Sequence, residues 1–280
     1  MREPGAAGPV QARNEDGIGR RELLAVSFGT SYPQSRERTI AAIEQTLEDA
    51  FPSYDLRRAF TSRVVIALTE KQEGLTIDHM DRALQRAVDN GVEELVIQPT
   101  HLLEGLEYQR LLGAARERAG QFRRLSVGKP LLTDEEDFKA VARALIRAQA
   151  PFQDGETALV LMGHGTTAQC NAVYPKLERV LRTLGGEHWF VGTVEAEPDL
   201  EAVLAEVRAG HYRRVVLRPL MIVAGDHATN DMAGEEGSWK QAFTQAGYEV
   251  LCQLQGLGEL EEIRRIFVRH TQEAVETTML

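Results

Sequence analysis

Three of the seven histidines directly follow predicted strands. His101, His164 and His227 come after apolar runs at 95–98, 158–162 and 215–217. In a parallel α/β sheet the carboxyl ends of the strands share one edge, and ligands bind along that edge. An imidazole exchanges protons near neutral pH, and its neutral form binds first-row metals. The pattern therefore predicts a cleft in which protons are transferred or a metal is bound.

Two acidic residues occupy matching places. Glu195 ends the predicted strand at 189–194, and Glu107 holds in the first half of the chain the place that His227 holds in the second. Taken alone, Glu195 is typical of a solvated acid before Pro198, and Glu107 of a carboxylate in the first turn of a helix. Two imidazoles and a carboxylate suit Co, Ni, Fe or Zn, and these ligand types do not choose among them.

Several common sites are excluded. The chain has neither H-E-x-x-H nor the cysteine set of a structural zinc site, and no glycine-rich nucleotide motif follows the first strand. His188 and His211 precede strands, and His79 and His270 lie on predicted helices, so we assign none of these four a role in the cleft.

Two glycine-threonine turns could bind an anion. Gly29-Thr30-Ser31 and Gly165-Thr166-Thr167 each follow a strand. They are typical of plain helix caps, yet such turns can also present backbone N–H groups to an anion. His101 could equally be a hydrogen-bonded residue in the wall of the cleft. These alternatives stay open on the sequence alone.

Strands and helices alternate along the chain. We expect strands at 23–28, 54–60, 95–98, 125–127, 158–162, 189–194, 215–217 and 250–254. Helices are expected at 33–50, 64–73, 77–90 and 104–120. A further helix follows the turn at 163–167 and ends at 184, and others are expected at 199–209, 230–246 and 260–275. This alternation predicts an α/β fold with parallel sheets that are flanked by helices.

The two halves of the chain are similar. Ser27-Phe28-Gly29-Thr30 aligns with Gly163-His164-Gly165-Thr166, and Ile97-Gln98-Pro99 aligns with Leu217-Arg218-Pro219. We therefore predict two similar lobes, related by a pseudo-twofold internal repeat, with a cleft between their strand ends. The N-terminal lobe would span 21–150, and the C-terminal lobe, with most metal ligands, 151–280.

Composition limits the possible partners. A net charge of -10 and a pI of about 5.3 argue against general binding to nucleic acid or an anionic membrane. Two cysteines without a C-x-x-C motif indicate a reduced, cytoplasmic protein. Residues 1–20 are expected to form a disordered tail, and no apolar run is long enough to span a bilayer. The oligomeric state stays open, a homo-oligomer included.

Several segments resemble the anaerobic cobalt chelatases, which insert Co²⁺ into sirohydrochlorin on the oxygen-independent route to cobalamin. The most specific of them is the run at 225–232. The others are the segments at 26–32, 58–62, 105–108, 162–165, 194–195 and 219–239.

The resemblance implies a fold and a site. The fold is the two-lobed class II chelatase fold. The implied metal ligands are His164, Glu195 and His227, with His164 as proton acceptor and Glu107 as a further acid that assists catalysis. In place of Thr166-Thr167-Ala168-Gln169 some relatives carry additional histidines. This departure puts in doubt an auxiliary metal-loading site but leaves the three ligands.

The implied partners are sirohydrochlorin and a divalent metal, with Co²⁺ as substrate and no permanently bound cofactor. We expect the macrocycle to contact both strand-end turns and the wall of the cleft, at Phe28, Gly29, Thr30, Ser31, His101, Gly165 and Thr166. Arg58 and Arg63 are weaker candidates for binding its carboxylates. The alternatives are insertion of Fe²⁺ or Ni²⁺ by the same fold, or a protein that binds metal or tetrapyrrole without catalysis.

Overall fold

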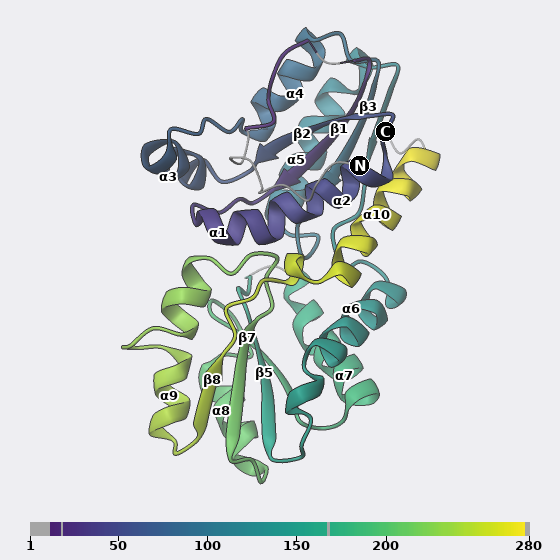
Figure 1. Cartoon of the computed structure of the whole chain (residues 1–280). Coiled ribbons are helices and arrows are strands. Elements are labelled where there is room, and N and C mark those ends of the chain that lie inside the picture. The colour runs from purple at the N-terminus through teal and green to yellow at the C-terminus, as the bar shows by residue number, and fades with distance from the viewer. Residues whose placement is uncertain (1–11, 18, 167–168, 278–280) are drawn as a thin grey trace, which may run out of the picture.

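The computed structural model describes residues 12–17, 19–166 and 169–277. Figure 1 shows two lobes, each built on a four-stranded parallel sheet. The N-terminal sheet has the order β2-β1-β3-β4, and the C-terminal sheet the order β6-β5-β7-β8. The strands are β1 (Arg21–Ser27), β2 (Asp55–Phe60), β3 (Glu94–Pro99), β4 (Arg124–Val127), β5 (Thr157–Gly163), β6 (Trp189–Thr193), β7 (Arg214–Pro219) and β8 (Glu249–Cys252). The predicted fold class is confirmed.

Alternation along the strands explains how the helices cover the N-terminal sheet. Leu23 and Ala25 of β1 face α2 (Ala42–Ala50) and α10 (Glu261–Glu276), while Leu24 and Val26 face α4 (Met80–Asp89) and α5 (Leu106–Arg118). Successive side chains of a strand point to opposite faces, so a strand buried on both faces is apolar throughout. The predicted helix at 33–50 comprises α1 (Pro33–Arg36), a π-helical segment (Glu37–Ala41) and α2.

The C-terminal sheet is covered in the same way. Leu159 and Leu161 of β5 face α6 (Glu135–Ala148) and α7 (Val173–Gly185). Val160 and Met162 face α8 (Leu200–Ala209) and α9 (Trp239–Gln245). Both sheets therefore present the carboxyl ends of their strands toward the space between the lobes (Figure 1).

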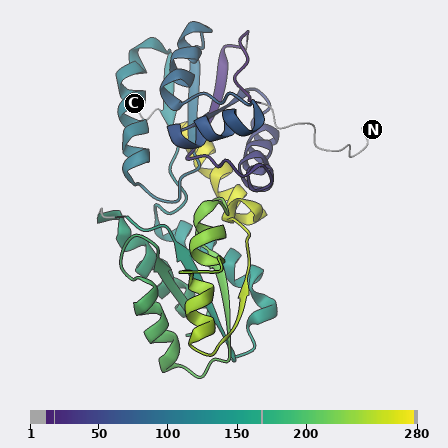
Figure 2. The same cartoon turned by 90° about the vertical axis from the view of Figure 1, so that its left-hand side faces the viewer.

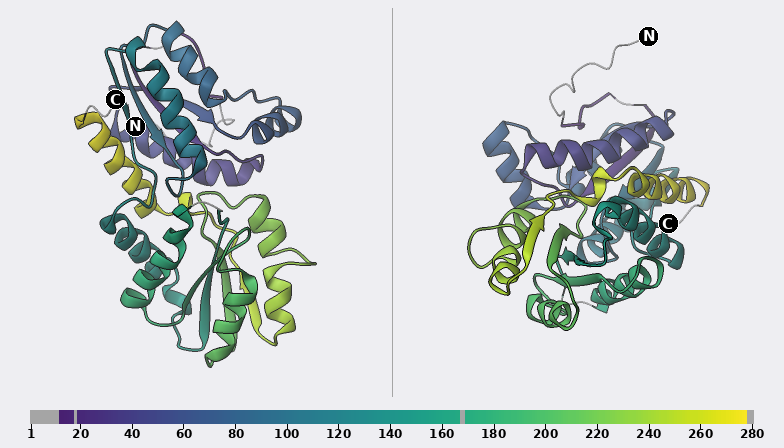
Figure 3. Two further views of the ribbon diagram at one scale, coloured as in Figure 1. Left: turned by 180° about the vertical axis from the view of Figure 1, so that it is seen from behind. Right: turned by 60° about the horizontal axis from the view of Figure 1, so that its bottom comes forward.

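Two helices are exchanged between the lobes. Helix α6 follows β4 of the first sheet but packs against α7, and α10 follows β8 of the second sheet but packs against α2 and β3. Figures 2 and 3 show α10, in yellow, running from the C-terminal lobe along the N-terminal lobe. The sequence analysis predicted no helix at 135–148. The predicted boundary at residue 150 divides the chain in sequence. In space, α6 packs on the C-terminal lobe and α10 packs on the N-terminal lobe.

Part of the predicted disordered tail packs on the N-terminal lobe. The Arg13 guanidinium donates to the Glu48 carboxylate at 3.0 Å, and the backbone carbonyl of Arg13 accepts from the backbone N–H of Arg58 at 3.1 Å. The backbone N–H of Gly19 donates to the Asp55 carboxylate. Residues 12–17 and 19–20 are thus held by polar contacts, and residues 1–11 lie outside the described part. Across the described residues, no helix combines the length and apolar character that crossing a membrane requires.

Candidate metal centre

Three strand ends of the C-terminal lobe converge. His164 directly follows β5, Glu195 follows β6 and His227 follows β7, and one ligand atom from each lies within 4.8 Å of the others. Ligand atoms on one first-row ion, bound at about 2.0–2.2 Å, are at most about 4.4 Å apart. Small side-chain rotations would therefore bring all three onto one ion.

The His164 ring is oriented by its neighbour. Its Nδ1 donates to the Gly165 carbonyl at 2.9 Å, which leaves the lone pair of Nε2 available. The ring is about half exposed and meets the His227 ring edge to face, with centroids 4.6 Å apart and planes at 89°. The arrangement suits a proton acceptor or a metal ligand that can be reached from the cleft.

The backbone turn directly after His164 requires glycine. Gly165 has φ +87°, and a Cβ there would lie 2.9 Å from the backbone N of Ala196. This close approach brings the segment after β6 beside His164, and Glu195 N–H donates to the His164 carbonyl at 2.9 Å. The Glu195 carboxylate is about half exposed, with Oε2 3.7 Å from His164 Nδ1. The turn thus fixes the spacing of two of the three side chains.

The His227 ring is held by a carboxylate that the sequence analysis missed. Its Nδ1 donates to Asp231 Oδ2 at 2.7 Å, so Nε2 is the nitrogen left for a metal. A carboxylate that bonds the second nitrogen of a ligating histidine fixes its tautomer and raises its basicity. The sequence signal was the spacing i,i+4 in a helical segment, here the π-helix Ala228–Met232.

Glu107 and His101 lie outside this group. Glu107 is in the first turn of α5, where its carboxylate pairs with Arg110 at 2.7 Å. Both ring nitrogens of His101 are buried and have no hydrogen-bond partner among the described residues. Burial lowers the pKa of His101 to about 4, so the ring is neutral at physiological pH. The alternative of a hydrogen-bonded wall residue is therefore wrong for His101.

One of the two predicted anion-binding turns, the one after β5, is occupied by the protein itself. Gly165 N–H donates to the Tyr174 hydroxyl at 3.2 Å, and Thr166 N–H donates to Asn171 Oδ1 at 3.0 Å. A substrate carboxylate could use these N–H groups only by breaking those bonds. Thr167 and Ala168 lie outside the described residues. Tyr174 was not anticipated from the sequence.

The turn after β1 has one exposed side chain beside buried ones. Gly29 and Thr30 are buried, Ser31 is half-buried, and Phe28 is 52% exposed. A Cβ at Gly29 would lie 2.5 Å from the Phe60 ring, so this glycine allows the turn to lie flat on the core. Within this turn, Phe28 is the side chain that a ligand can cover.

The two arginines predicted to bind carboxylates differ. Arg58 is buried, and its guanidinium donates to both carboxylate oxygens of Glu44, at 2.7 and 2.5 Å. That expectation is corrected for Arg58, because the strand points it under α2. The side chain of Arg63 is 74% exposed, and its contact among the described residues is a 3.4 Å surface pair with Asp81.

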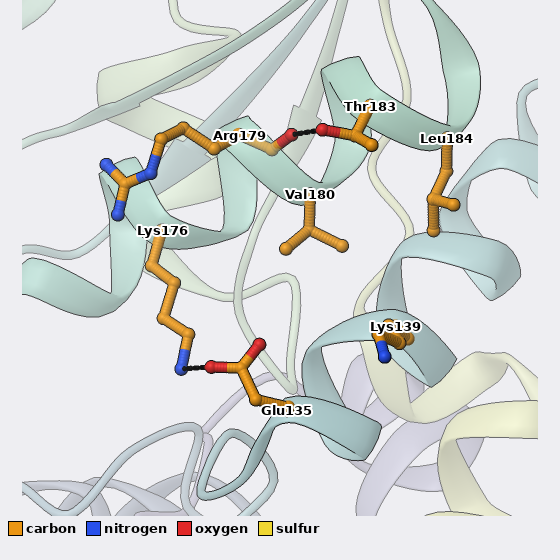
Figure 4. Close-up of a pocket in the computed structure, with 7 residues that line it drawn as sticks. All are labelled: Glu135, Lys139, Lys176, Arg179, Val180, Thr183 and Leu184. Atoms are coloured by element: carbon orange, nitrogen blue, oxygen red, sulfur yellow. Dashed lines mark hydrogen bonds and ion pairs between the residues drawn. The ribbon is translucent and has the colours of Figure 1, made fainter.

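The remaining histidines have structural contacts or lie elsewhere. His79 caps α4, where its Nδ1 accepts from Asp81 N–H at 3.3 Å, and His270 is buried against Asp137 at 2.8 Å. A surface pocket of about 330 Å³ between α6 and α7 also lies apart from the predicted site (Figure 4). Its lining includes Lys176, paired with Glu135 at 2.6 Å, and none of the predicted site residues.

A side-chain bond joins the two lobes next to His227. The Tyr32 hydroxyl, at the start of α1, donates to Asp226 Oδ1 at 3.1 Å, and Asn230 donates to the same oxygen at 2.9 Å. Gly225 lies beside Thr30, since a Cβ there would be 3.4 Å from the Thr30 hydroxyl. The turn after β1 and the turn that carries His227 therefore meet.

A parallel two-lobed fold with histidine and carboxylate side chains at its strand ends is that of the class II chelatases. Among solved structures, the chain is similar to SirB from Bacillus subtilis with Fe3+, at a TM-score of 0.62 and 17% identity over 91% of this chain and 96% of that one. CbiX, described as the terminal enzyme of siroheme biosynthesis in denitrifying bacteria, is similar at a TM-score of 0.54 and 18% identity, over 91% and 99% of the two chains.

Residues 21–276 match the family described as cobalt chelatase (CbiK), and the chain belongs to that family. It is 38% identical over 257 residues to a sirohydrochlorin cobaltochelatase of Salmonella typhimurium, which covers 91% of this chain and 97% of the relative. It is 30% identical over 262 residues to the sirohydrochlorin cobaltochelatase CbiKC of Nitratidesulfovibrio vulgaris, covering 91% of each. The predicted family is confirmed.

Proposed function

We propose that this protein is a sirohydrochlorin cobaltochelatase, which inserts Co²⁺ into sirohydrochlorin and releases two protons. The observation that carries this function is the convergence of His164, Glu195 and His227 at three strand ends, in a chain of the cobalt chelatase family. Two imidazoles and one carboxylate bind Co²⁺ while leaving coordination positions open. Open positions are needed because the ion must pass to the four ring nitrogens.

The site residues divide the chemistry. His164, with Nδ1 held by the Gly165 carbonyl, is suited to accept a pyrrole proton at Nε2. His227, oriented by Asp231, and Glu195 would hold the ion beside it as water is lost. In this proposal Glu107 is a further acid of the opposite lobe that takes part in proton removal. Its bond to Arg110 would have to open first.

The test is metal insertion followed by absorbance, with purified protein, sirohydrochlorin and Co²⁺. His164→Ala and His227→Ala should each reduce the rate to that of the uncatalysed reaction, while circular dichroism stays unchanged. His211→Ala is the matched control, because this exposed histidine precedes β7 at the opposite edge of the sheet. Wild-type rates in both site variants would refute the proposed centre.

The same assay separates the alternatives. A metal panel of Co²⁺, Fe²⁺ and Ni²⁺ ranks the substrates, which ligand chemistry alone does not. A carrier without catalysis would bind sirohydrochlorin in a fixed ratio and would not convert an excess of it. Conversion of many equivalents per protein therefore distinguishes the enzyme from the carrier.

A further inference from the structure

Helix α3 (Arg63–Glu73) buries one of its residues, Thr69. Val64 is 70% exposed and Leu68 39% exposed, and side chains four residues apart lie on one face of a helix. Val65 and Ile66 pack toward the core residues Ile40 and Phe60. The helix is therefore apolar on its inner face and also on an outer face that the described chain leaves uncovered.

This outer face continues onto the turn after β1. Ser62, the N-cap of α3, donates its backbone N–H to the Phe28 carbonyl at 3.2 Å, so the exposed Phe28 ring belongs to the same edge of the lobe. Four of the seven large apolar side chains that are exposed in the described chain follow the strands of this sheet: Phe28, Val64, Leu68 and Leu106. Exposed apolar side chains that gather on one part of a surface often mark a binding site.

The edge lies near the segment that carries His227, because Val223 packs on the same apolar cluster as Val65 and Ile66 of α3. Tyr32, four residues after Phe28, bonds Asp226, and Asp226 directly precedes His227. In Figures 1 and 3, α3 stands out from the N-terminal lobe on the side of the molecule where α9 lies. The apolar edge thus lies close to the segment that carries His227 and belongs to the lobe opposite the three ligands.

Charge at the border fits a carboxylate-rich ligand. Arg63, directly before Val64, has a 74% exposed side chain, and its contact with Asp81 is a long surface pair at 3.4 Å. Pairs of this kind contribute little and exchange readily with another carboxylate. An apolar surface beside a guanidinium that can exchange its carboxylate partner matches a flat macrocycle with an apolar face and carboxylates on its rim.

We propose that Phe28, Val64 and Leu68 form an apolar platform that binds one face of the tetrapyrrole, with Arg63 binding a carboxylate of its rim. The proposal rests on the proposed function and adds to it the surface that determines affinity for the macrocycle. The metal ligands then approach the ring from the C-terminal lobe, while the platform supports it from the N-terminal lobe. None of the platform residues contributes to metal binding.

The experiment compares two double variants. Val64→Ser with Leu68→Ser removes two of the three platform side chains. Leu184→Ser with Leu254→Ser is the control, because those leucines are 45% and 46% exposed at other places on the surface. Sirohydrochlorin binding is measured by fluorescence on metal-free protein, Co²⁺ binding is measured without tetrapyrrole, and insertion kinetics are measured with both.

We expect the platform variant to raise the Kd and KM for sirohydrochlorin about tenfold, because two apolar side chains lose their contact with the ring. Its kcat and Co²⁺ affinity should stay within about twofold of wild type, and the control should match wild type in all four values. Equal behaviour of the two variants overturns the platform. The platform is also overturned if the wild type sediments as a dimer and the platform variant as a monomer, because these residues would then form an interface between copies of the chain. Failure of the wild type to insert any metal refutes the proposed function, and the binding measurement still tests the platform.

Discussion

Replacing Asp231 by alanine removes the carboxylate that accepts from His227 Nδ1 at 2.7 Å. The ring then loses the bond that fixes its tautomer, and Nε2 becomes a weaker and less ordered ligand. Asp231 has no other hydrogen bond from its side chain among those found in the described chain. The substitution therefore tests the orientation of His227 rather than the packing of the lobe.

The size of the effect follows from the geometry and the exposure. Removing the hydrogen-bonded partner of a ligating histidine costs about 10–100-fold in metal affinity. The side chains of Asp231 and His227 are 44% and 33% exposed, so water can replace part of the lost bond. We therefore expect the low end, about tenfold in the Kd for Co²⁺, or about 1.4 kcal/mol. Asp231→Asn keeps a neutral acceptor, whose bond is about half as strong, and should cost about threefold.

The assay is a Co²⁺ titration of tetrapyrrole-free protein, followed by calorimetry or by the visible absorption of bound Co²⁺. Asp226→Asn is the control, because Asp226 lies next to His227 yet bonds Tyr32 and Asn230 instead. Its Kd should stay within about twofold of wild type. Wild-type affinity in Asp231→Ala would refute the inference that this carboxylate orients the metal ligand.

Three further predictions concern the cleft, the pH dependence and the turn. Tyr32→Phe removes the bond across the cleft and should speed deuterium exchange of the amides at 225–232; unchanged exchange would contradict this. Burial raises the pKa of Glu22 to about 8 from an ordinary 4.5, so the folded state holds a proton that the unfolded state releases. Urea unfolding should therefore show stability falling between about pH 4.5 and 8, by a few kcal/mol, and Glu22→Gln should flatten that slope. Gly165→Ala should lower the free energy of unfolding by about 2 kcal/mol or more in thermal unfolding and weaken Co²⁺ binding in a titration. Gly165 has a φ of +87°, and the space that a Cβ would occupy is filled. Gly113→Ala, where nothing lies within 4 Å, should be neutral or stabilising in the same thermal and metal titrations.

The placement of the candidate ligands could be predicted because it depends on the backbone. Parallel strands align their carboxyl ends, so His164, Glu195 and His227 had to reach one edge once β5, β6 and β7 were identified. The spacing of His227 and Asp231 was also readable, as a pair one helical turn apart. What the spacing could not give was the direction of each ring, which depends on the Gly165 carbonyl and the Asp231 carboxylate.

The contacts that the sequence could not give are made by side chains that reach across from other elements. The N–H groups of Gly165 and Thr166 are bonded by Tyr174 and Asn171, which come from the segment after the turn. Nothing in a glycine-threonine turn tells which side chains fold back on it. Arg58 similarly became a buried partner of Glu44 because β2 passes under α2.

The missed helix α6 is a different case, since its signals were present. Asp134 and Asp137 form a capping box, and Phe138, Val141 and Leu145 follow at helical spacing. The sequence could therefore have given the helix itself. It could not have given the partner of the helix, because packing on α7 of the other sheet is a tertiary choice.

The exchange of α6 and α10 ties the two lobes together. The chain passes between the lobes at 128–134 and again at 253–260, and the Asp137–His270 contact joins the two exchanged helices. In Figure 1 these helices lie on one side of the molecule, and α1 lies on the other. Both helices belong to one apolar cluster that also contains Leu23 of β1 and Leu159 of β5, so pulling the lobes apart would expose a core that they share.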